Sequence, residues 1–406
     1  MYVYMGHMRY EDTKPYEDRY WEKNKIHLVQ DRITEIAFTQ KKLLANSGKA
    51  YAYDQLIIAT GSSPNTLNIE GENLEGVTGF YHLQDLEYMI ASSMPNKKVV
   101  VIGGGLIGIE LAEMFHSRKI EVTHLVREDR YAASVLSEAE SAIIDQHIID
   151  HNIDLRFKTE IQKINDTGEG KVKSVTTLQG EEIECDLVCV AIGVTPNVRW
   201  IKEGELDINR GIMVDEYLQT NIPDVFAIGD CAELKRPGSG RKSIEPIWYT
   251  GRMMGETVAH TICQQKTKYD PGIWFYSAKF FNIEYQCYGD VSPEHAKDYE
   301  TLIWQDRLRG KSFRMQYTDS GVTGFSVLGI RLRQNVCEKW IRMHCPVEKV
   351  LEELELAIFD PEFSVTCEDQ IREVYQKMTG VQLQKRGKRE FNRVFRFLKR
   401  DNILSP

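Results

Sequence analysis

A glycine-rich stretch near residue 100 is the clearest candidate for chemistry in the sequence. KKVVVIGGGLIGIELAEMF, residues 97–115, places Gly103, Gly105 and Gly108 in the spacing G-x-G-x-x-G behind an apolar run at 99–102. Between a strand and a helix, such glycines allow a tight turn, close approach of the backbone to a pyrophosphate and close packing of the helix. The amides that open the helix then face the phosphates. The stretch therefore predicts a dinucleotide-binding turn.

The next predicted strand ends in charged residues that could choose between the two nicotinamide cofactors. In IEVTHLVRED, residues 120–129, Val126 and Arg127 stand where an acidic residue would hold a ribose 2′-hydroxyl or an arginine would hold a 2′-phosphate, and Glu128 follows. Arg127 favours NADPH over NADH. Because a strand end read from sequence can shift by a residue or two, NADH selection by Glu128 and a solvated loop stay open.

Two carboxylates stand at positions where more than one role is open. Glu110 lies in the first turns of the predicted helix, beside the face that carries Ile107. It either favours the positive end of the helix dipole or reaches inward toward a redox centre. Asp230 follows Gly229 at the end of the apolar run VFAI. It either accepts hydrogen bonds from the hydroxyls of a ribityl chain or caps a following helix.

An internal repeat indicates that the glycine turn belongs to the second of two similar domains. YDQLIIATGSSPN, residues 53–65, matches CDLVCVAIGVTPN, residues 185–197, at a constant offset of 132 residues. Short apolar runs ended by a glycine are typical of buried parallel strands whose carboxyl ends approach a ligand. We therefore expect two nucleotide-binding domains, with one inserted in the other.

The same spacing bears on where the first domain's own glycine turn would lie. Gly193 follows Gly103 by 90 residues, and the same interval counted back from Gly61 reaches about thirty residues ahead of Met1. The expectation is either a fragment or misjudged start of a longer protein, or the loss of a half-domain.

Composition limits the class of protein. The chain has 406 residues, enough for two or three domains, and a net charge of −9 that gives no support to general nucleic-acid binding. There is no run of eighteen apolar residues, so no membrane span is expected and a cytoplasmic location follows. The eight cysteines form no CxxC pair and have no zinc-site spacing, which predicts reduced, mostly buried thiols and no metal site.

The predicted organisation is three domains of α/β class. Residues 1–94 and 198–265 form a first α/β domain, residues 95–197 form the inserted dinucleotide-binding domain, and residues 266–406 form an α+β domain. The last contains antiparallel strands within 273–291 and 301–329, followed by helices. A helix is expected over Trp248–Cys263.

Three motifs in this order resemble one enzyme family. IIATGSSP, VVVIGGGLIGIELA and TNIPDVFAIGD resemble the pyridine nucleotide-disulfide oxidoreductase family of FAD flavoproteins, above all its rubredoxin-reductase, NADH-oxidase and nitrite-reductase branches. The resemblance covers about residues 15–265. It implies two Rossmann-like domains, the FAD domain being incomplete at its N-terminus, with FAD and NAD(P)H as cofactors and the 266–406 domain as an interface domain.

The resemblance also implies roles for single residues. FAD would be contacted by Ala59, Thr60, Gly61, Gly229 and Asp230, with Ile33 near the adenine. The NAD(P)H path would be lined by Gly103, Gly105, Ile107, Gly108, Ile192 and Gly193, with Glu110 near the nicotinamide and flavin N5. Trp248 and Tyr249 would neighbour the flavin ring at the start of a helix whose dipole favours negative charge at N1 of reduced flavin.

The sequence departs from the family pattern in three respects. The N-terminal FAD fingerprint is missing, together with the segment that usually supplies a lysine partner for Glu110, so FAD affinity is open. Residues 1–50 hold no cysteine, and residues 266–406 show no His-Pro…Glu stretch of the disulfide-reductase kind. Cys231 has no second cysteine near it in sequence, which favours a structural thiol over a redox-active one.

The function expected from these features is hydride transfer from NAD(P)H to FAD, followed by electron transfer to a small acceptor or a redox protein. The alternative is a flavin-free NAD(P)-binding or interaction protein without turnover. A homodimer is one expected assembly. The basic tail, residues 384–400, predicts a surface helix, with docking on an acidic carrier or an anionic membrane as the alternative.

Overall fold

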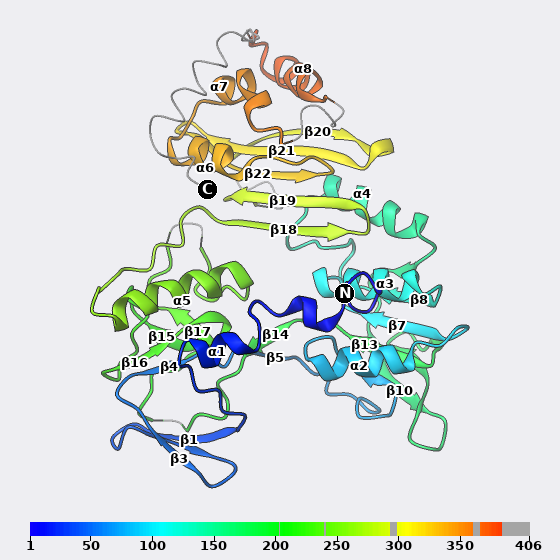
Figure 1. Ribbon diagram of the computed structural model, residues 1–406. Helices are drawn as coiled ribbons and strands as arrows, with labels where there is room; N and C mark the ends of the chain where they lie inside the picture. The colour runs from blue at the N-terminus through cyan, green and yellow to red at the C-terminus, as the bar shows by residue number, and fades with distance from the viewer. Residues whose placement is uncertain (203, 239–240, 293–298, 360–365, 384–406) are drawn as a thin grey trace. The chain divides into compact units, whose positions relative to one another are not determined.

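The computed structural model describes residues 1–202, 204–238, 241–292, 299–359 and 366–383, and the predicted basic tail lies outside these described residues (Figure 1). The chain forms two compact units. Unit 1 comprises residues 1–103, 117–120 and 161–272, and unit 2 comprises residues 104–116, 121–160 and those from 273 onward. The three domain boundaries expected from the sequence stay a prediction.

Unit 1 contains short parallel strands at the places where the sequence shows apolar runs. β4 (Leu56–Ile58) pairs with β16 (Val225–Ala227), β13 (Leu187–Val190) pairs with both β6 (Val77–Thr78) and β7 (Lys98–Ile102), and β15 (Ile212–Val214) pairs with β17 (Ala232–Leu234). The α-helices of this unit are α1 (Arg19–Lys23), α2 (Leu83–Ser92) and α5 (Trp248–Ile262). The predicted helix after Ile247 is thereby confirmed.

Antiparallel strands complete unit 1. They are β1 (Ile33–Ala37), β2 (Lys42–Ala45) and β3 (Ala50–Ala52) in one sheet, β10 (Ile161–Asp166), β11 (Val172–Thr177) and β12 (Glu182–Glu184) in another, and the pair β5 (Ser62–Pro64) with β14 (Val194–Pro196). Single 3-10 turns occur at η1 (Tyr10–Thr13) and η2 (Gly229–Cys231). The core packs Val214, Val225 and Ala227 with Val258 of α5.

Unit 2 begins within the glycine turn, at Gly104, and continues into the helix that follows. It contains α3 (Leu106–Ser117), the parallel strands β8 (Glu121–Leu125) and β9 (Asp154–Arg156), and α4 (Glu138–Asp150) between them. A capping box starts α4, because the Ser137 hydroxyl accepts from the Glu140 amide at 3.3 Å and the Glu140 carboxylate accepts from the Ser137 amide at 2.9 Å.

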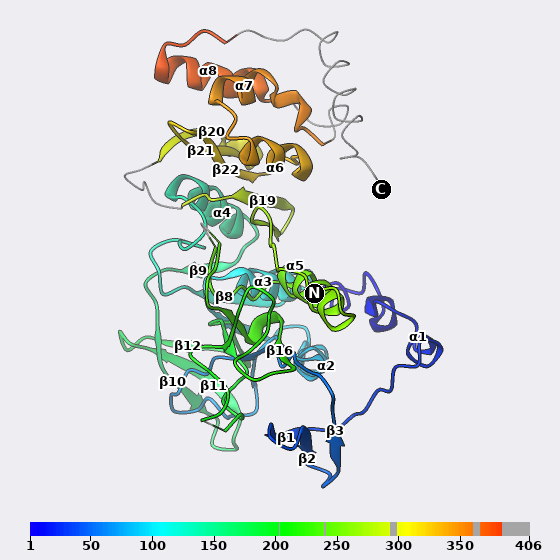
Figure 2. The same cartoon turned by 90° about the vertical axis from the view of Figure 1, so that its left-hand side faces the viewer.

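The C-terminal part of unit 2 is an antiparallel sheet with strand order β18-β19-β22-β21-β20. Its strands are β18 (Phe275–Phe280), β19 (Ile283–Gly289), β20 (Glu300–Asp306), β21 (Lys311–Thr318) and β22 (Gly321–Leu328), as the sequence predicts, with η3 (Arg307–Arg309) between β20 and β21. They are followed by α6 (Gln334–Arg342), α7 (Val347–Glu352), η4 (Leu354–Leu356) and α8 (Glu368–Thr379). α6 lies against β19 and β22, and α8 lies against β20 (Figures 1 and 2).

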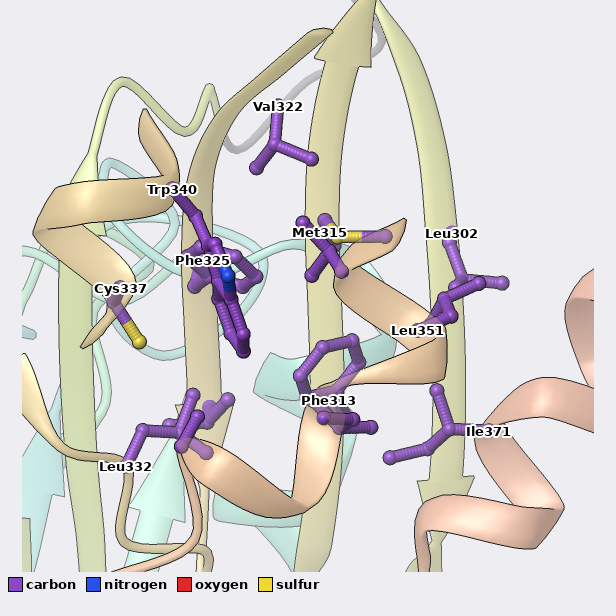
Figure 3. Packing of buried hydrophobic residues seen from close by; sticks show 14 of the residues in the cluster. Leu302, Phe313, Met315, Val322, Phe325, Leu332, Cys337, Trp340, Leu351 and Ile371 are labelled. Atoms are coloured by element: carbon purple, nitrogen blue, oxygen red, sulfur yellow. The ribbon is translucent and has the colours of Figure 1, made fainter. Parts of the chain in front are cut away.

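The two faces of this sheet differ in chemistry because side chains alternate along a strand. Phe313, Met315 and Phe325 face the apolar core formed with the helices, as Figure 3 shows. Arg314 and Ser326 are also buried, and they contact Glu140 of α4: Arg314 Nε lies 2.9 Å from Glu140 Oε2, and the Ser326 hydroxyl donates to Glu140 Oε1 at 2.6 Å. A buried ion pair therefore joins α4 to the sheet. None of the helices in the described part of the chain is both long and apolar enough to cross a bilayer.

Candidate nucleotide-binding sites

The first glycine of the fingerprint is required by its backbone. Gly103 directly follows β7 and has a φ of +122°, a conformation that side chains rarely adopt. A Cβ atom added there would lie 2.2 Å from the carbonyl oxygen of Ala191, which follows β13. Gly103 therefore allows the end of β7 to lie close to the end of the neighbouring strand.

The two middle glycines of the turn differ in the space around their Cβ positions, which is filled at Gly104 and open at Gly105. A Cβ atom on Gly104 would lie 2.7 Å from the Val126 side chain, whereas a Cβ atom on Gly105 would meet no heavy atom within 4 Å. Gly108, one helical turn further on, is buried in α3, and Ile107 is half-buried. The open side at Gly105 fits the approach of a pyrophosphate to the start of α3.

Glu110 is half-buried on α3, in the turn that follows the fingerprint. Burial raises the pKa of Glu110, and the negative charge of Glu113 adds to the rise. Glu113 itself is engaged by Lys279 of β18, with Nζ and Oε1 2.8 Å apart. A carboxyl group with a raised pKa can hold a proton closer to neutral pH, so both roles read from the sequence remain open for Glu110.

The two charged residues that follow β8, Arg127 and Glu128, are placed differently relative to the glycine turn. The Arg127 side chain is 71% exposed and its guanidinium pairs with the Glu128 carboxylate at 2.9 Å. The other carboxylate oxygen of Glu128 lies 3.6 Å from the Cβ position of Gly104. Glu128 is thus placed beside the turn, while Arg127 extends into solvent.

The two copies of the internal repeat meet in unit 1 and bind each other reciprocally. The Asn65 amide donates to the Gly193 carbonyl at 3.0 Å, and the Asn197 amide donates to the Gly61 carbonyl at 2.9 Å. Two longer side-chain bonds repeat the relation, from Asn65 Nδ2 to the Ile192 carbonyl and from Asn197 Nδ2 to the Thr60 carbonyl, both at 3.3 Å. The structure therefore brings the predicted residues Thr60, Gly61, Ile192 and Gly193 together, next to the exposed Ala59.

Asp230 is fixed by the first copy of the repeat. Gly229 has a φ of +70° and open space around its Cβ position, and the Asp230 carboxylate accepts from the Ser62 hydroxyl at 2.7 Å. The capping alternative is wrong, because Ile228 is the N-cap of η2 and the chain continues from Cys231 into β17. Asp230 remains a candidate acceptor for ligand hydroxyls.

The start of α5 lies beside this glycine and carries two exposed aromatic rings. Gly251 approaches Gly229, with 3.6 Å between the Gly251 Cβ position and the Gly229 Cα atom. Trp248 is 69% exposed and Tyr249 is 37% exposed. Unit 1 therefore groups residues 59–62, 229–230 and 248–251.

Two further predicted residues, Ile33 and Cys231, make contacts of a purely structural kind. Ile33 is half-buried in β1 and pairs with Ala45 of β2, so its place near an adenine stays a prediction. The Cys231 thiol is buried and bonds to the carbonyls of Ile58 and Ile228 at 3.5 and 3.3 Å, as expected of a structural thiol. Among the residues that the structure describes, no three His, Cys, Asp or Glu side chains form a group suited to a metal ion.

Sequence reasoning missed the partners that hold these groups in place. A buried, bidentate ion pair between Arg241 and Glu245, at 2.6 and 2.5 Å, fixes the segment before α5. Tyr131 donates its hydroxyl to the Gly105 carbonyl. The sequence carries no specific signal for these contacts. An Arg and a Glu four residues apart, or a Tyr behind a charged loop, are equally compatible with many surface roles.

Comparison with known proteins gives one consistent family. The family model "Pyridine nucleotide-disulphide oxidoreductase" matches residues 9–259. Nitrite reductase [NAD(P)H] of Bacillus subtilis is 29% identical over 68% of this chain and 34% of its own length, and rhodocoxin reductase of Rhodococcus erythropolis is 33% identical over 57% of this chain and 54% of its own. A NAD-dependent persulfide reductase from A. fulgidus superposes with a TM-score of 0.80 at 25% identity, over 93% of this chain and 76% of that one. The chain thus spans about a third to a half of the length of these two curated relatives.

Proposed function

The chain belongs to the pyridine nucleotide-disulphide oxidoreductase family, as its motifs predict, and from this premise we propose that it is a flavoprotein that oxidises NAD(P)H and reduces a small acceptor or a redox protein. Oxidoreductases of this type use FAD and NAD(P)H. Bound FAD supplies the redox chemistry, by taking a hydride and passing electrons on. The observation that carries the proposal is the open glycine turn between β7 and α3.

The glycine turn holds the nicotinamide dinucleotide in this proposal. Gly103 gives the tight turn, Gly105 leaves room for the pyrophosphate, and Gly108 lets α3 pack closely. Ile107 and the exposed Ile192-Gly193 peptide line the path of the dinucleotide. Glu110, whose pKa burial raises, holds a proton or orients the nicotinamide near the redox centre.

The group formed by residues 59–62, 229–230 and 248–251 holds FAD. Asp230, kept in place by Ser62, accepts hydroxyls of the ribityl chain, and Gly229 admits the pyrophosphate because the space beside it is open. Ala59, Thr60 and Gly61 line the flavin, and Ile33 lies toward the adenine. Trp248 and Tyr249 offer ring faces at the start of α5, whose amides favour negative charge.

The electron acceptor is a small molecule or a redox protein, and the location is the cytoplasm. The name of the rhodocoxin reductase relative supports a protein acceptor. Eight free cysteines support a reducing compartment.

The first experiment combines absorbance with nucleotide titration. The purified protein is expected to be yellow, with flavin absorbance that NADH or NADPH bleaches without oxygen. A colourless protein that binds NADH would favour the flavin-free alternative. A colourless protein that binds neither dinucleotide would contradict both.

Gly105→Val tests the turn itself. A branched side chain enters the open side and blocks contacts of about 1.5–3 kcal/mol each, so NAD(P)H affinity should fall by about thirtyfold or more while the fold persists. Gly238→Val is a matched control, since its Cβ position meets only the Arg241 side chain at 3.7 Å, and it should keep the affinity of the parent. Unchanged affinity in Gly105→Val would remove the turn from the site.

The choice of cofactor is tested at the pair behind β8. The position of Glu128 beside Gly104 supports NADH, through a bond to a ribose hydroxyl, whereas Arg127 supports NADPH. Glu128→Ala should weaken NADH by about tenfold if the acid selects. If the arginine selects, Arg127→Ala should weaken NADPH by about 1.5–3 kcal/mol, more than tenfold, and leave NADH almost unchanged. Equal affinities in the parent and both variants would show that this segment is a solvated loop.

A further inference from the structure

Two successive carbonyl groups of the glycine turn are held by one neighbouring segment of unit 2. The Tyr131 hydroxyl donates to the Gly105 carbonyl, and the Ala132 amide donates to the Gly104 carbonyl at 3.2 Å. The Gly105 carbonyl also accepts the first bond of α3, from the Ile109 amide at 3.3 Å. Both bonds from residues 131–132 therefore act on peptide groups at the helix start.

The planarity of the peptide bond determines what this does to the amides. In a trans peptide, the C=O of one residue and the N–H of the next point in opposite directions. A bond to the Gly104 carbonyl therefore orients the Gly105 amide, and a bond to the Gly105 carbonyl orients the Leu106 amide. The open Cβ side of Gly105 leaves room for a ligand beside them, and consecutive amides of this kind form an anion-binding nest.

We propose that Tyr131 is a positioning residue for dinucleotide binding, which holds the Gly105–Leu106 peptide so that its amide faces the pyrophosphate. The inference rests on the proposed binding of NAD(P)H at the glycine turn. Tyr131 contacts the turn through the carbonyl of Gly105, so it acts on the ligand through the backbone alone.

Burial, backbone hydrogen bonds and ring contacts hold Tyr131 in position. Its side chain is fully buried, its amide donates to Asp145 Oδ1 at 3.1 Å, and its carbonyl accepts from the Ser141 hydroxyl at 2.8 Å. Its ring meets His124 and Phe280 edge-on, at centroid distances of 5.6 and 6.3 Å. Burial raises the pKa of Tyr131, so its hydroxyl keeps the proton that it donates.

The next residue adds a second sign of a constrained turn. Ala132 has a φ of +51°, a left-handed conformation that is unfavourable for a non-glycine residue and persists only where surrounding contacts enforce it. Its amide bond to Gly104 is such a contact. The cradle for the pyrophosphate is therefore supported by α4, through Ser141 and Asp145, and by β18, through Phe280.

The test is Tyr131→Phe, which removes the hydroxyl and keeps the ring. Dissociation constants for NADH and for ADP-ribose, which carries the pyrophosphate without nicotinamide, should both rise by the same factor, between about three- and tenfold. Tyr285→Phe is the matched control: it removes another buried hydroxyl of unit 2, bonded to Tyr276 and Ser326, and should leave both constants unchanged. Ser141→Ala, which loosens Tyr131 without altering it, should weaken both ligands by about twofold.

The outcomes separate this inference from the proposed function. A parent protein that binds neither NADH nor ADP-ribose would overturn the proposed function. A parent that binds both, with Tyr131→Phe binding equally well, would overturn the inference alone, and so would a lower melting temperature of Tyr131→Phe without a change in affinity. A loss confined to NADH would also overturn it, because the pyrophosphate would then not be the group that Tyr131 serves.

Discussion

The two copies of the internal repeat share a sequence pattern and differ in how well they are covered. β13, in the second copy, has strand neighbours on both edges, and Leu187, Val188 and Cys189 are at most 3% exposed. β4, in the first copy, pairs with β16, and Ile57 at its centre is 38% exposed. A run of apolar residues ended by glycine therefore specifies a strand and its turn, whereas burial depends on which neighbours the strand finds.

The segments that follow these two strands make the same contacts in both copies, although the strands themselves differ in burial. Both copies continue into short strands, β5 and β14, that pair with each other, and both use their Pro-Asn ends to bind the opposite glycine segment. The reciprocal contact needs the same residues on each side, so the matching residues at the ends of the repeat have a structural reason.

The largest difference is expected from apolar truncation of the strands. Leu187→Ala removes a buried side chain from β13 and should lower the free energy of unfolding by about 2–4 kcal/mol. Ile57→Ala removes a side chain that is already partly hydrated, so its cost should stay below about 1 kcal/mol. Urea unfolding followed by circular dichroism measures both. Equal losses would mean that β4 is as well covered in solution as β13.

A smaller effect is expected from the reciprocal asparagines. Asn65→Ala and Asn197→Ala each remove a side-chain bond to the other copy and should each cost about 1 kcal/mol. The loss for Asn65→Ala should be the greater one, because Asn65 Oδ1 also accepts from the Thr195 hydroxyl at 2.5 Å. Thermal unfolding of both variants measures the two losses. An unchanged melting temperature at either position would show that this asparagine does not stabilise the contact between the copies.

The smallest effect is expected at the aspartate that is the second residue of each copy, and it depends on pH. Burial alone would raise the pKa of Asp186, but hydrogen bonds from the Lys97 ammonium at 2.6 Å and the Lys98 amide at 2.9 Å, with both lysine charges, lower it. A lowered folded-state pKa gives stability above the unfolded value of about 3.9, and that stability is lost as the pH falls through the folded value.

Asp186→Asn should therefore cost less than about 1 kcal/mol at pH 7, since the pair is partly exposed, and progressively less as the pH falls through the lowered folded-state pKa. Asp54→Asn is the matched control, because Lys41 bonds to the backbone carbonyl of Asp54. A pH-independent loss in Asp186→Asn, measured by unfolding at pH 3 and pH 7, would contradict the assigned role of the carboxylate.

Much of the fold could be predicted because its signals are local. The apolar runs before Gly61, Gly103 and Gly193, the α5 helix after Ile247 and the alternating strands from 273 onward all follow from spacing and turn residues. The turns at Gly61, Gly103, Gly193 and Gly229 could be predicted in the same way, since each of these glycines follows such a run, whereas the ligands assigned to them stay a prediction.

The contacts that hold the site could not be predicted, because they join residues that only the folded chain brings together. The Ser62 hydroxyl meets Asp230 across 168 residues of sequence, and the Tyr131 hydroxyl meets Gly105 across 26. Arg314 reads as a surface residue of a strand, and it is 2% exposed because Glu140 balances its charge. Partner choice of this kind leaves no periodic signal in the sequence.

The buried thiols of the chain can report local unfolding of each unit separately. Seven of the eight cysteines are buried and one, Cys263, is exposed. Burial raises the pKa of Cys185 and Cys287 to about 12, so neither carries the thiolate that reacts with alkylating reagents at neutral pH. Modification at these sites must wait for local unfolding. Cys185 belongs to unit 1 and Cys287 to unit 2. Their alkylation rates would therefore measure the rate of local opening in each unit separately, in a single sample.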